Sequence, residues 1–318
     1  MGHRVQHLLP MVSNGILERQ NEEHCLRALA AQRLLYSRAK LLTGARAAFT
    51  ALLPVATWLG AIWWPQLRPW GVGLVLAWLF LDLTLFTRAE NQWRLLAARM
   101  QEWFDTRVLE IEWSTHLAGL RPTAEDFAGV MPGGPSPKQR RALVDWYPVA
   151  VGSLPMGWAR LACQRVNAWW DGSQHLAYAR ASTFFVVVWA AVPTIVGTWS
   201  NVPVHDYLMT FLGPVVPLLA WGLRERDQHT RAATKLDDLR RSAVATWHRC
   251  IEDGVEPDAR ATRALQDQIF DSRRTCPPVF DWVYRLQRAK KEAGALDLAC
   301  ETVDAVKERL KVSGRGAQ

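Results

Sequence analysis

The sequence lacks the short motifs that mark most enzymes and nucleotide-binding folds. It has no G-x-S-x-G, no H-E-x-x-H, no Walker loop and no dinucleotide glycine pattern. Cysteine is scarce and scattered, with no C-x-x-C, at Cys25, Cys163, Cys250, Cys276 and Cys300. This pattern argues against a disulfide framework and a zinc cluster, and the histidines are isolated too. We therefore expect no catalytic residues, no bound metal and no cofactor.

Charge is absent from two long apolar runs and nearly absent from two more. Residues 47–64 and 181–200 carry none, residues 71–87 carry only Asp82, and residues 204–223 carry only His205 and Asp206. Each run approaches the ~20 residues that a helix needs to cross a bilayer core. The pattern predicts four transmembrane helices in two hairpins. The alternative is that the four runs are buried helices of a large soluble bundle.

The basic residues predict which side of the membrane each segment occupies. Segments 1–46, 88–180 and 224–318 hold seven, eleven and nineteen Lys and Arg, whereas the connecting loops 65–70 and 201–206 hold one and none. The positive-inside rule then places both termini and the middle segment in the cytoplasm. Arginines beside the runs, such as Arg46 and Arg224, would lie near anionic headgroups. We interpret the net charge of +8 as a topology signal and expect no DNA or RNA polymer as partner.

The remaining segments predict helices and no strands. Helical spacing or unbroken runs indicate helices at about 16–43, 71–118, 155–180, 224–252, 258–274 and 280–311, and 131–141 reads as a loop. The expected fold is an all-α membrane protein with long cytosolic helices. Its predicted parts are an N-terminal cytosolic helix (1–46), a transmembrane hairpin (47–87), a cytosolic helical segment (88–180), a second transmembrane hairpin (181–223) and a C-terminal cytosolic helical segment (224–318).

Two cytosolic helices carry polar residues along one face. Arg160, Gln164, Asn167 and Asp171 share one such face, and Arg263, Asp267, Asp271 and Arg274 share another. Intrahelical ion pairs or polar contacts between helices would explain both faces. The other interpretation is a pocket for a polyanion, with arginines for phosphates and aromatic rings for base stacking.

The order of these parts resembles the SMODS-associated four-transmembrane (S-4TM) effectors of bacterial CBASS antiphage systems. The resemblance rests on FDTRVLEIEW (104–113), on DWYP (145–148) with Cys163-Gln164-Arg165 and Trp170-Asp171, and on LQDQIFDSRR (265–274) followed by DWVYR (281–285). It implies a pore-forming or membrane-disrupting effector of the bacterial inner membrane. It also implies a cyclic oligonucleotide made by a partner nucleotidyltransferase as the trigger, membrane lipids as partners, and a homo-oligomer as the active state.

On this hypothesis the cytosolic helices bind the nucleotide. Arg165, Arg273 and Arg274 are the expected phosphate contacts, and Tyr147 and Tyr284 are the expected stacking rings. A second hypothesis is a four-span scaffold that recruits cytosolic partners. A third, a membrane-embedded enzyme, would need paired acidic residues at one depth, which Asp82 and Asp206 do not provide.

The apolar runs contain two acidic residues. Asp206 lies near the end of its run, whereas Asp82 lies well inside its run. It precedes Thr87, the predicted cytoplasmic end of that run, by five residues, or roughly 8 Å along a helix. A carboxylate there needs either a local partner, such as Arg46, Arg224 or a hydroxyl on another span, or a place at the mouth of an assembled pore.

Overall fold

The chain is helical throughout the part that the structure describes. The computed structural model describes residues 13–64, 66, 68–199, 203–207, 215–280, 294 and 300–309. Every regular element in those residues is a helix, which confirms the all-α class. In chain order the elements are α1 (Ile16–Gln20), α2 (Glu23–Trp63), α3 (Arg68–Leu81), the π-helix η2 (Asp82–Phe86), α4 (Thr87–Val108), α5 (Thr115–Ala118), α6 (Ala124–Val130), α7 (Pro137–Arg141), the 3-10 helix η3 (Val149–Ser153), α8 (Met156–Trp199), α9 (Val204–Tyr207), α10 (Val216–Asp253) and α11 (Ala259–Thr275).

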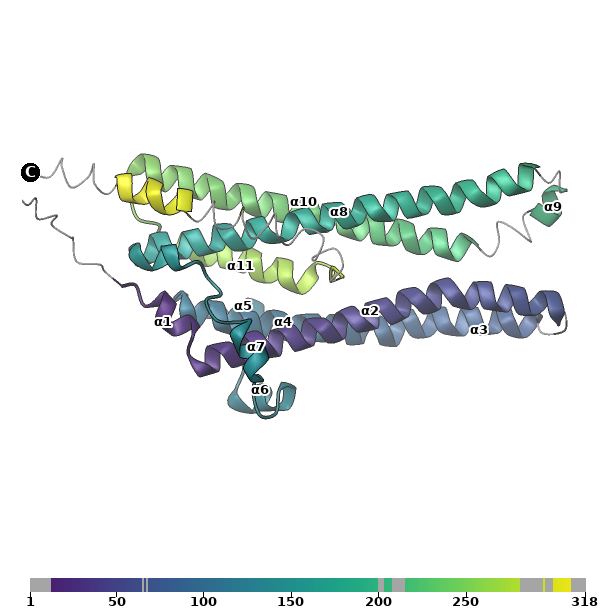
Figure 1. Cartoon of the computed structure of the whole chain (residues 1–318), viewed down its shortest axis with the longest axis horizontal. Coiled ribbons are helices and arrows are strands. Elements are labelled where there is room, and N and C mark those ends of the chain that lie inside the picture. The colour runs from purple at the N-terminus through teal and green to yellow at the C-terminus, as the bar shows by residue number, and fades with distance from the viewer. Residues whose placement is uncertain are drawn as a thin grey trace, which may run out of the picture.

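Two long hairpins determine the shape of the molecule (Figure 1). In the first hairpin α2 packs along the continuous run of α3, η2 and α4, and in the second hairpin α8 packs along α10. Helix α11 contacts α4, α8 and α10, so it joins the two hairpins at the end that also carries α1. At the opposite end each hairpin projects beyond the other elements, and we call these two projecting ends the arms.

The packed end of the molecule, which we call the base, contains the hydrophobic core. Fully buried side chains from α2, α4, α8 and α11 meet there, including Leu29, Phe104, Leu161 and Ile269. Burying one such side chain stabilises the fold by roughly 1.5–3 kcal/mol. The base is therefore a soluble-type helical core from which the arms extend.

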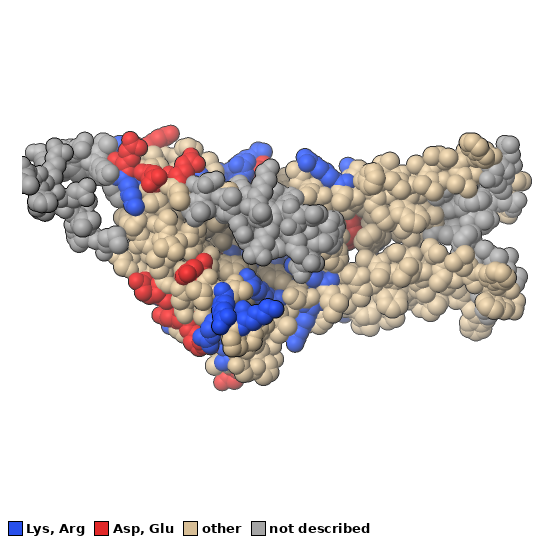
Figure 2. Space-filling model, viewed as in Figure 1, with Lys and Arg blue, Asp and Glu red and all other residues tan. Residues whose placement is uncertain are grey.

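The arms expose apolar side chains instead of burying them. Large exposed side chains there include Leu52, Phe80, Phe184 and Ile195. On the face shown in Figure 2, charged residues lie over the base, and the described part of the arms is largely uncharged. Contiguous apolar surface of this kind marks a membrane or protein interface. Within the described residues, one helical stretch, Gln174–Trp199, is long and apolar enough by itself to cross a membrane.

Close helix contact within the second hairpin depends on a glycine. A Cβ atom on Gly222 of α10 would lie 2.7 Å from Cγ2 of Val186 on α8, so a larger residue would push the two helices apart. In the first hairpin, Trp78 stacks on Phe49 at 4.9 Å between ring centroids and donates an indole N–H to Thr50 Oγ1 at 3.2 Å. In each hairpin the two helices thus pack against each other through contacts of their own.

Two predicted helices and one predicted loop differ from the structure. The helix predicted at 71–118 changes to a π-helix at Asp82 and ends at Val108, because Glu110 adopts a φ of 51° that an α-helix cannot accommodate. The helix predicted at 16–43 breaks after Gln20 and restarts at Glu23. The predicted loop 131–141 contains α7, which begins with a capping box between Ser136 and Gln139. The predicted helix 280–311 lies mostly outside the described residues, although 300–309 is helical.

Candidate functional site

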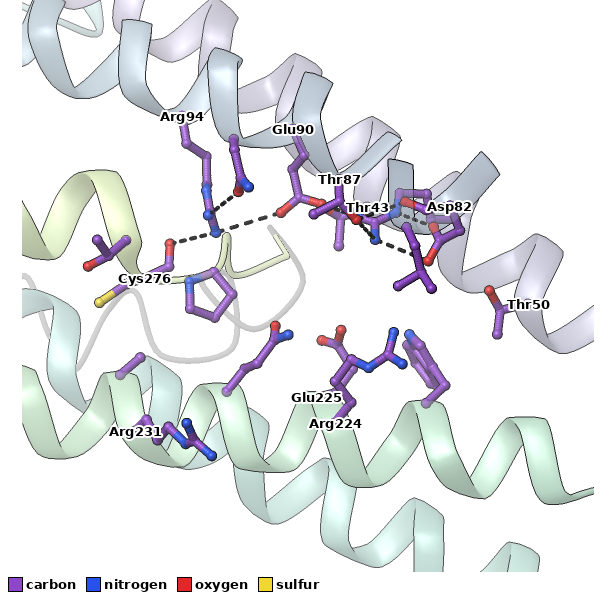
Figure 3. A pocket seen from close by; sticks show the side chains of 18 of the residues that line it. Thr43, Thr50, Asp82, Thr87, Glu90, Arg94, Arg224, Glu225, Arg231 and Cys276 are labelled. Carbon is purple, nitrogen blue, oxygen red and sulfur yellow. Dashed lines mark hydrogen bonds and ion pairs between the residues drawn. The ribbon is translucent and has the colours of Figure 1, made fainter. Parts of the chain in front are cut away.

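A cleft separates the two hairpins where the arms leave the base. We call it the inter-hairpin cleft; its volume is about 570 Å³ (Figure 3). One wall comes from α2, η2 and α4, the other from α10, and the end of α11 closes one side. Its charged lining residues are Arg46, Asp82, Glu90, Arg94, Arg224, Glu225, Arg231 and Lys235. The cleft is thus a polar space directly beside apolar arms.

On the first wall, Arg46 pairs with two carboxylates. It donates from Nε to Asp82 Oδ1 at 2.5 Å and from Nη2 to Thr87 Oγ1 at 2.9 Å, and its Nη1 pairs with Glu90 Oε2. Asp82 is buried, with 6 % of its surface exposed. The local partner expected for Asp82 is therefore Arg46 on α2.

Arg94 extends the polar network of that wall toward α11. Its Nη2 donates to Asn91 Oδ1 at 2.6 Å, and its Nη1 donates to the carbonyl of Cys276 at 3.3 Å. Glu90 lies 3.7 Å from the same guanidinium. Arg94 thereby ties α4 to the segment that follows α11.

On the opposite wall, most charged residues of α10 pair with residues of α10 itself or of α11, and not with the first hairpin. Glu225 lies 3.6 Å from His229 Nε2, Arg231 pairs with Asp227 at 2.7 Å, and Lys235 pairs with Asp271. Arg224 makes no ion pair or hydrogen bond with any residue that the structure describes. In Figure 3, Arg224 and Glu225 rise from α10 toward the side of the cleft that holds Asp82.

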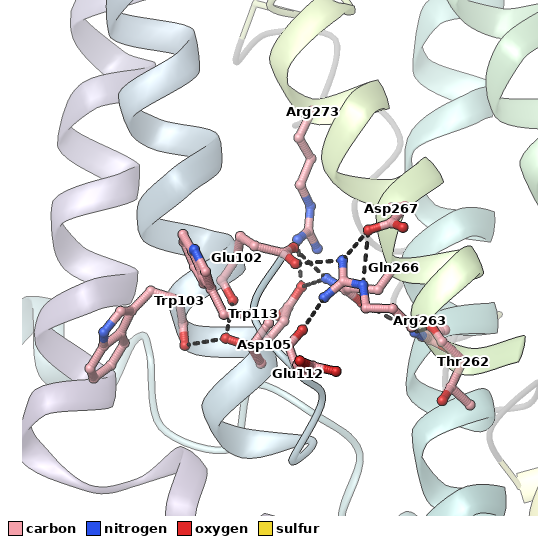
Figure 4. Close-up of polar contacts among 12 residues, drawn as sticks. Glu102, Trp103, Asp105, Glu112, Trp113, Thr262, Arg263, Gln266, Asp267 and Arg273 are labelled. Atoms are coloured by element: carbon pink, nitrogen blue, oxygen red, sulfur yellow. Dashed lines mark hydrogen bonds and ion pairs between the residues drawn. The ribbon is translucent and has the colours of Figure 1, made fainter. Parts of the chain in front are cut away.

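A second polar group lies inside the base, where α4 meets α11 (Figure 4). Glu102 and Asp105 of α4 are both 0 % exposed. Arg263 Nη2 donates to Glu102 Oε1 at 2.8 Å, and Arg273 Nη1 donates to Asp105 Oδ2 at 2.5 Å. Gln266 Nε2 donates to both carboxylates, at 2.8 and 3.0 Å. We call Glu102, Asp105, Arg263, Gln266 and Arg273 the buried polar cluster.

Burial and ion pairing shift the pKa values of these groups in opposite directions. Burial raises the pKa of Glu102, and this effect exceeds the lowering by the Arg263 charge. Although burial by itself favours neutral Arg273, the Asp105 carboxylate raises the pKa of that guanidinium. With two carboxylates facing two guanidinium groups, the buried polar cluster is balanced in charge. Its geometry is that of a structural network joining α4 to α11.

Two of the five predicted ligand residues lie at this cluster. Tyr147 is buried and donates its hydroxyl hydrogen to Asp105 Oδ1 at 2.7 Å, and burial followed by the Asp105 charge raises the Tyr147 pKa well above its usual value. Arg273 contacts the same carboxylate, and its side chain is 7 % exposed. A ligand would therefore reach Tyr147 and Arg273 only after α11 separates from α4.

The other predicted ligand residues lie apart from that pair. Arg165 is half-buried, with its guanidinium carbon 4.8 Å from the Trp247 ring centroid and Nη1 donating to Thr302 Oγ1 at 3.2 Å. Arg274 is exposed and pairs with Asp271 at 2.8 Å. Tyr284 lies outside the described residues. The structure brings Tyr147 and Arg273 together and leaves Arg165 and Arg274 elsewhere.

Residues of the two polar helix faces contact neighbouring segments and also form an ion pair within α11. Arg160 donates to the Leu109 and Glu110 carbonyls, Gln164 donates to the Thr262 carbonyl at 2.7 Å, and Asn167 donates to the Tyr147 hydroxyl at 3.3 Å. On α11, Arg263 pairs with Asp267 within the helix at 2.6 Å. These contacts are the kind expected if the polar faces form ion pairs and contacts within the protein.

Sequence reasoning missed Glu102, Glu90, Arg94 and the role of Arg224. Glu102 precedes Asp105 by three residues and so shares its helix face, which was a usable signal. The cleft itself had no sequence signal, because its walls come from helices far apart in the chain.

One group of potential metal ligands occurs among the described residues. Suitable atoms of Glu22, His24 and Cys25 lie within 4.8 Å of one another. Arg107 Nε donates to His24 Nε2 at 2.6 Å, and burial together with the Glu22 charge raises the Cys25 pKa to about 12. A cation beside a protonated thiol does not favour metal binding.

Comparison with known proteins identifies the family. The SMODS-associating 4TM effector domain matches residues 14–299, so the chain belongs to that family. A protein of Bacillus cereus (strain VD146), described as a probable CBASS effector molecule, is 23% identical over 287 residues, which cover 87% of this chain and 94% of that protein. No solved structure matches the chain. The resemblance stated from the sequence is confirmed.

Proposed function

We propose that this member of the SMODS-associating 4TM effector family is an antiphage effector that permeabilises the bacterial inner membrane. One observation carries the proposal. The molecule joins a packed, charge-rich base to two arms that expose apolar side chains, including Leu52, Phe80 and Phe184. Such surface is stable in lipid, whereas the base is built like a soluble domain.

We propose that both hairpins span the membrane, so that the protein is multi-pass with both termini in the cytoplasm. The spans would come from segments 47–87 and 181–223, and the base from segments 1–46, 88–180 and 224–318. The charge distribution between segments supports this orientation through the positive-inside rule. The inter-hairpin cleft would then lie at the cytoplasmic boundary of the bilayer.

The proposed trigger is a cyclic oligonucleotide, made by a partner nucleotidyltransferase and bound on the cytoplasmic side. The family and the description of the Bacillus cereus relative support this trigger. A ligand opens the membrane only if it binds the permeable assembly more tightly than the resting one. Arg165, Arg274 and Tyr284 remain candidate contacts, whereas Tyr147 and Arg273 would require α11 to leave α4.

We further propose that the active form is a homo-oligomer. One copy of the protein supplies two hairpins, or four helices at most. Four helices enclose little aqueous space. Several copies packed through the exposed faces of their arms would form a larger opening, and the resting protein would keep those faces in lipid.

Liposome leakage tests the function directly. The full-length protein is reconstituted in vesicles loaded with a self-quenched dye, and a panel of cyclic di- and trinucleotides is added. We expect dye release with at least one member of the panel and none with the corresponding linear nucleotides. The absence of release across the panel, together with stable co-purification of a cytosolic protein, would instead support a membrane scaffold.

A further inference from the structure

We propose that the inter-hairpin cleft binds a phosphodiester-bearing ligand, with Arg224 as its phosphate contact. The inference rests on the proposed function and assigns its ligand site to a place that differs from the buried polar cluster. Three properties of the cleft lead to it: its size, its charge, and the absence of direct polar contact between its two walls.

The size of the cleft matches a small-molecule site. Its volume of about 570 Å³ falls within the roughly 300–1,000 Å³ typical of ligand pockets. Polar side chains other than the charged ones also line it, among them Thr43, Thr50, Asn91, Gln228 and Thr275. These groups offer both donors and acceptors for the sugar and base, or for the glycerol, that flank a phosphodiester.

The charge of the cleft favours an anion. Five basic residues and three acidic residues line it. Arg46 pairs with Asp82 and Glu90, Arg94 lies 3.7 Å from Glu90, and Glu225 lies 3.6 Å from His229. A phosphate entering the cleft therefore meets little unpaired negative charge.

Arg224 is the guanidinium that is ready to bind. Arg94, Arg231 and Lys235 each have a polar partner, whereas Arg224 has none among the residues that the structure describes. Guanidinium groups bind phosphate oxygens through two parallel N–H donors, which makes Arg the residue suited to this role. An exposed arginine that lines a net positive cleft needs no rearrangement to accept such a ligand.

The two walls of the cleft also lack a direct polar connection. Among the described lining residues, no hydrogen bond or ion pair joins α10 to α2, η2 or α4. A ligand held by Arg224 on α10 and by Thr87, Asn91 or Arg94 on α4 would supply that connection. It would thereby change how the two arms sit relative to each other, which is what a trigger must do.

The same chemistry occurs in two sources, a free cyclic oligonucleotide and an anionic lipid headgroup. The test uses the full-length protein with Arg224→Ala, and Arg226→Ala as the matched control. Arg226 is also exposed, lies two residues away on α10, and does not line the cleft. In the first arm, calorimetry in a neutral detergent measures binding of cyclic di- and trinucleotides. In the second arm, melting temperatures are compared in nanodiscs of phosphatidylglycerol and of phosphatidylcholine.

We expect Arg224→Ala to weaken binding of the active cyclic oligonucleotide about tenfold or more, and Arg226→Ala to leave it within about twofold. Loss of the phosphatidylglycerol-dependent rise in melting temperature in Arg224→Ala, with nucleotide binding unchanged, would assign the cleft to a lipid headgroup. Equal behaviour of the two variants in both arms would overturn the inference.

The two proposals fail separately. If a cyclic oligonucleotide binds and causes leakage but Arg224→Ala has no effect, the cleft is not the site and the proposed function stands. If no member of the panel binds or causes leakage, the nucleotide trigger fails, and the cleft is then judged by the lipid arm alone.

Discussion

Arg46 of α2 and Asp82 of η2 form a two-pronged ion pair, with Nε to Oδ1 at 2.5 Å and Nη2 to Oδ2 at 3.3 Å. The pair lies at the residue where α3 becomes a π-helix. Thr87 stabilises this turn by donating its hydroxyl hydrogen to the Asp82 carbonyl at 2.8 Å. π-Helical turns often occur at functional sites, and this one places a carboxylate at the wall of the cleft.

Replacing Asp82 with Asn should reduce ligand-dependent leakage to background, while membrane insertion and ligand binding persist. The change removes one of the two carboxylates that hold Arg46, and Glu90 still keeps that guanidinium paired. Dye release from loaded vesicles measures the effect, and membrane fractionation measures insertion.

The control for this change is Asp253→Asn. Asp253 is exposed at the end of α10, away from the cleft, so its loss should leave leakage at the wild-type level. If Asp82→Asn leaks as the wild type does, Asp82 has only a structural role.

Cysteine labelling should report the proposed topology. In a variant without native cysteines, Gln66→Cys lies between α2 and α3 at the tip of the first arm, and Lys138→Cys lies on α7 in the base. A membrane-impermeant maleimide added to intact cells should label position 66 and spare position 138. Labelling of both positions, or of position 138 alone, would contradict cytoplasmic placement of the base.

Removing the Asp105 carboxylate should destabilise the base strongly. Asp105→Ala leaves Arg273 buried without its counter-charge, which costs about 3–5 kcal/mol in the free energy of unfolding. Asp271→Asn, which breaks partly exposed pairs with Lys235 and Arg274, should cost less than about 1 kcal/mol. Denaturant unfolding monitored by tryptophan fluorescence compares the two; similar losses would mean that the buried polar cluster is not structural.

The pH dependence of stability should change in Glu102→Gln. Because the folded-state pKa of Glu102 is raised, the folded protein holds that proton more tightly than the unfolded chain does. The stability contributed by this group is complete below its ordinary pKa of 4.5 and is lost as pH rises through the raised value. The melting temperature of the wild type minus that of the variant should therefore fall as the pH rises above 4.5. A difference that does not vary with pH would argue against a raised pKa.

The sequence predicted the helical class and most helices well, but it predicted local breaks poorly. Helices at 155–180, 224–252 and 258–274 have counterparts in α8, α10 and α11, because long unbroken periodic segments have few alternatives. The π-helix at Asp82 and the positive φ of Glu110 had no such pattern. Both depend on contacts with other helices, and a residue list does not contain those contacts.

For the candidate site residues, too, the sequence predicted one part and missed another. The stretches 104–113, 145–148 and 265–274 stood out in the sequence, and they do meet in the base through Asp105, Tyr147 and Arg273. Their meeting explains why these stretches carry more polar residues than packing requires. It also gives Tyr147 and Arg273 partners within the protein, a result that single-residue chemistry did not predict.

Three properties can be read from the order of amino acids alone: the helical class, the separation of charges and apolar runs into different segments, and the family that the chain resembles. The first two properties follow from composition and spacing along one chain, and the resemblance rests on stretches such as 104–113, 145–148 and 265–274. The packing of the helices is what pairs Arg46 with Asp82, holds Arg273 against Asp105 and places Arg224 at a cleft between the hairpins. Each of these depends on which distant helices pack together, and pairing energies inside the fold are set by distance and burial.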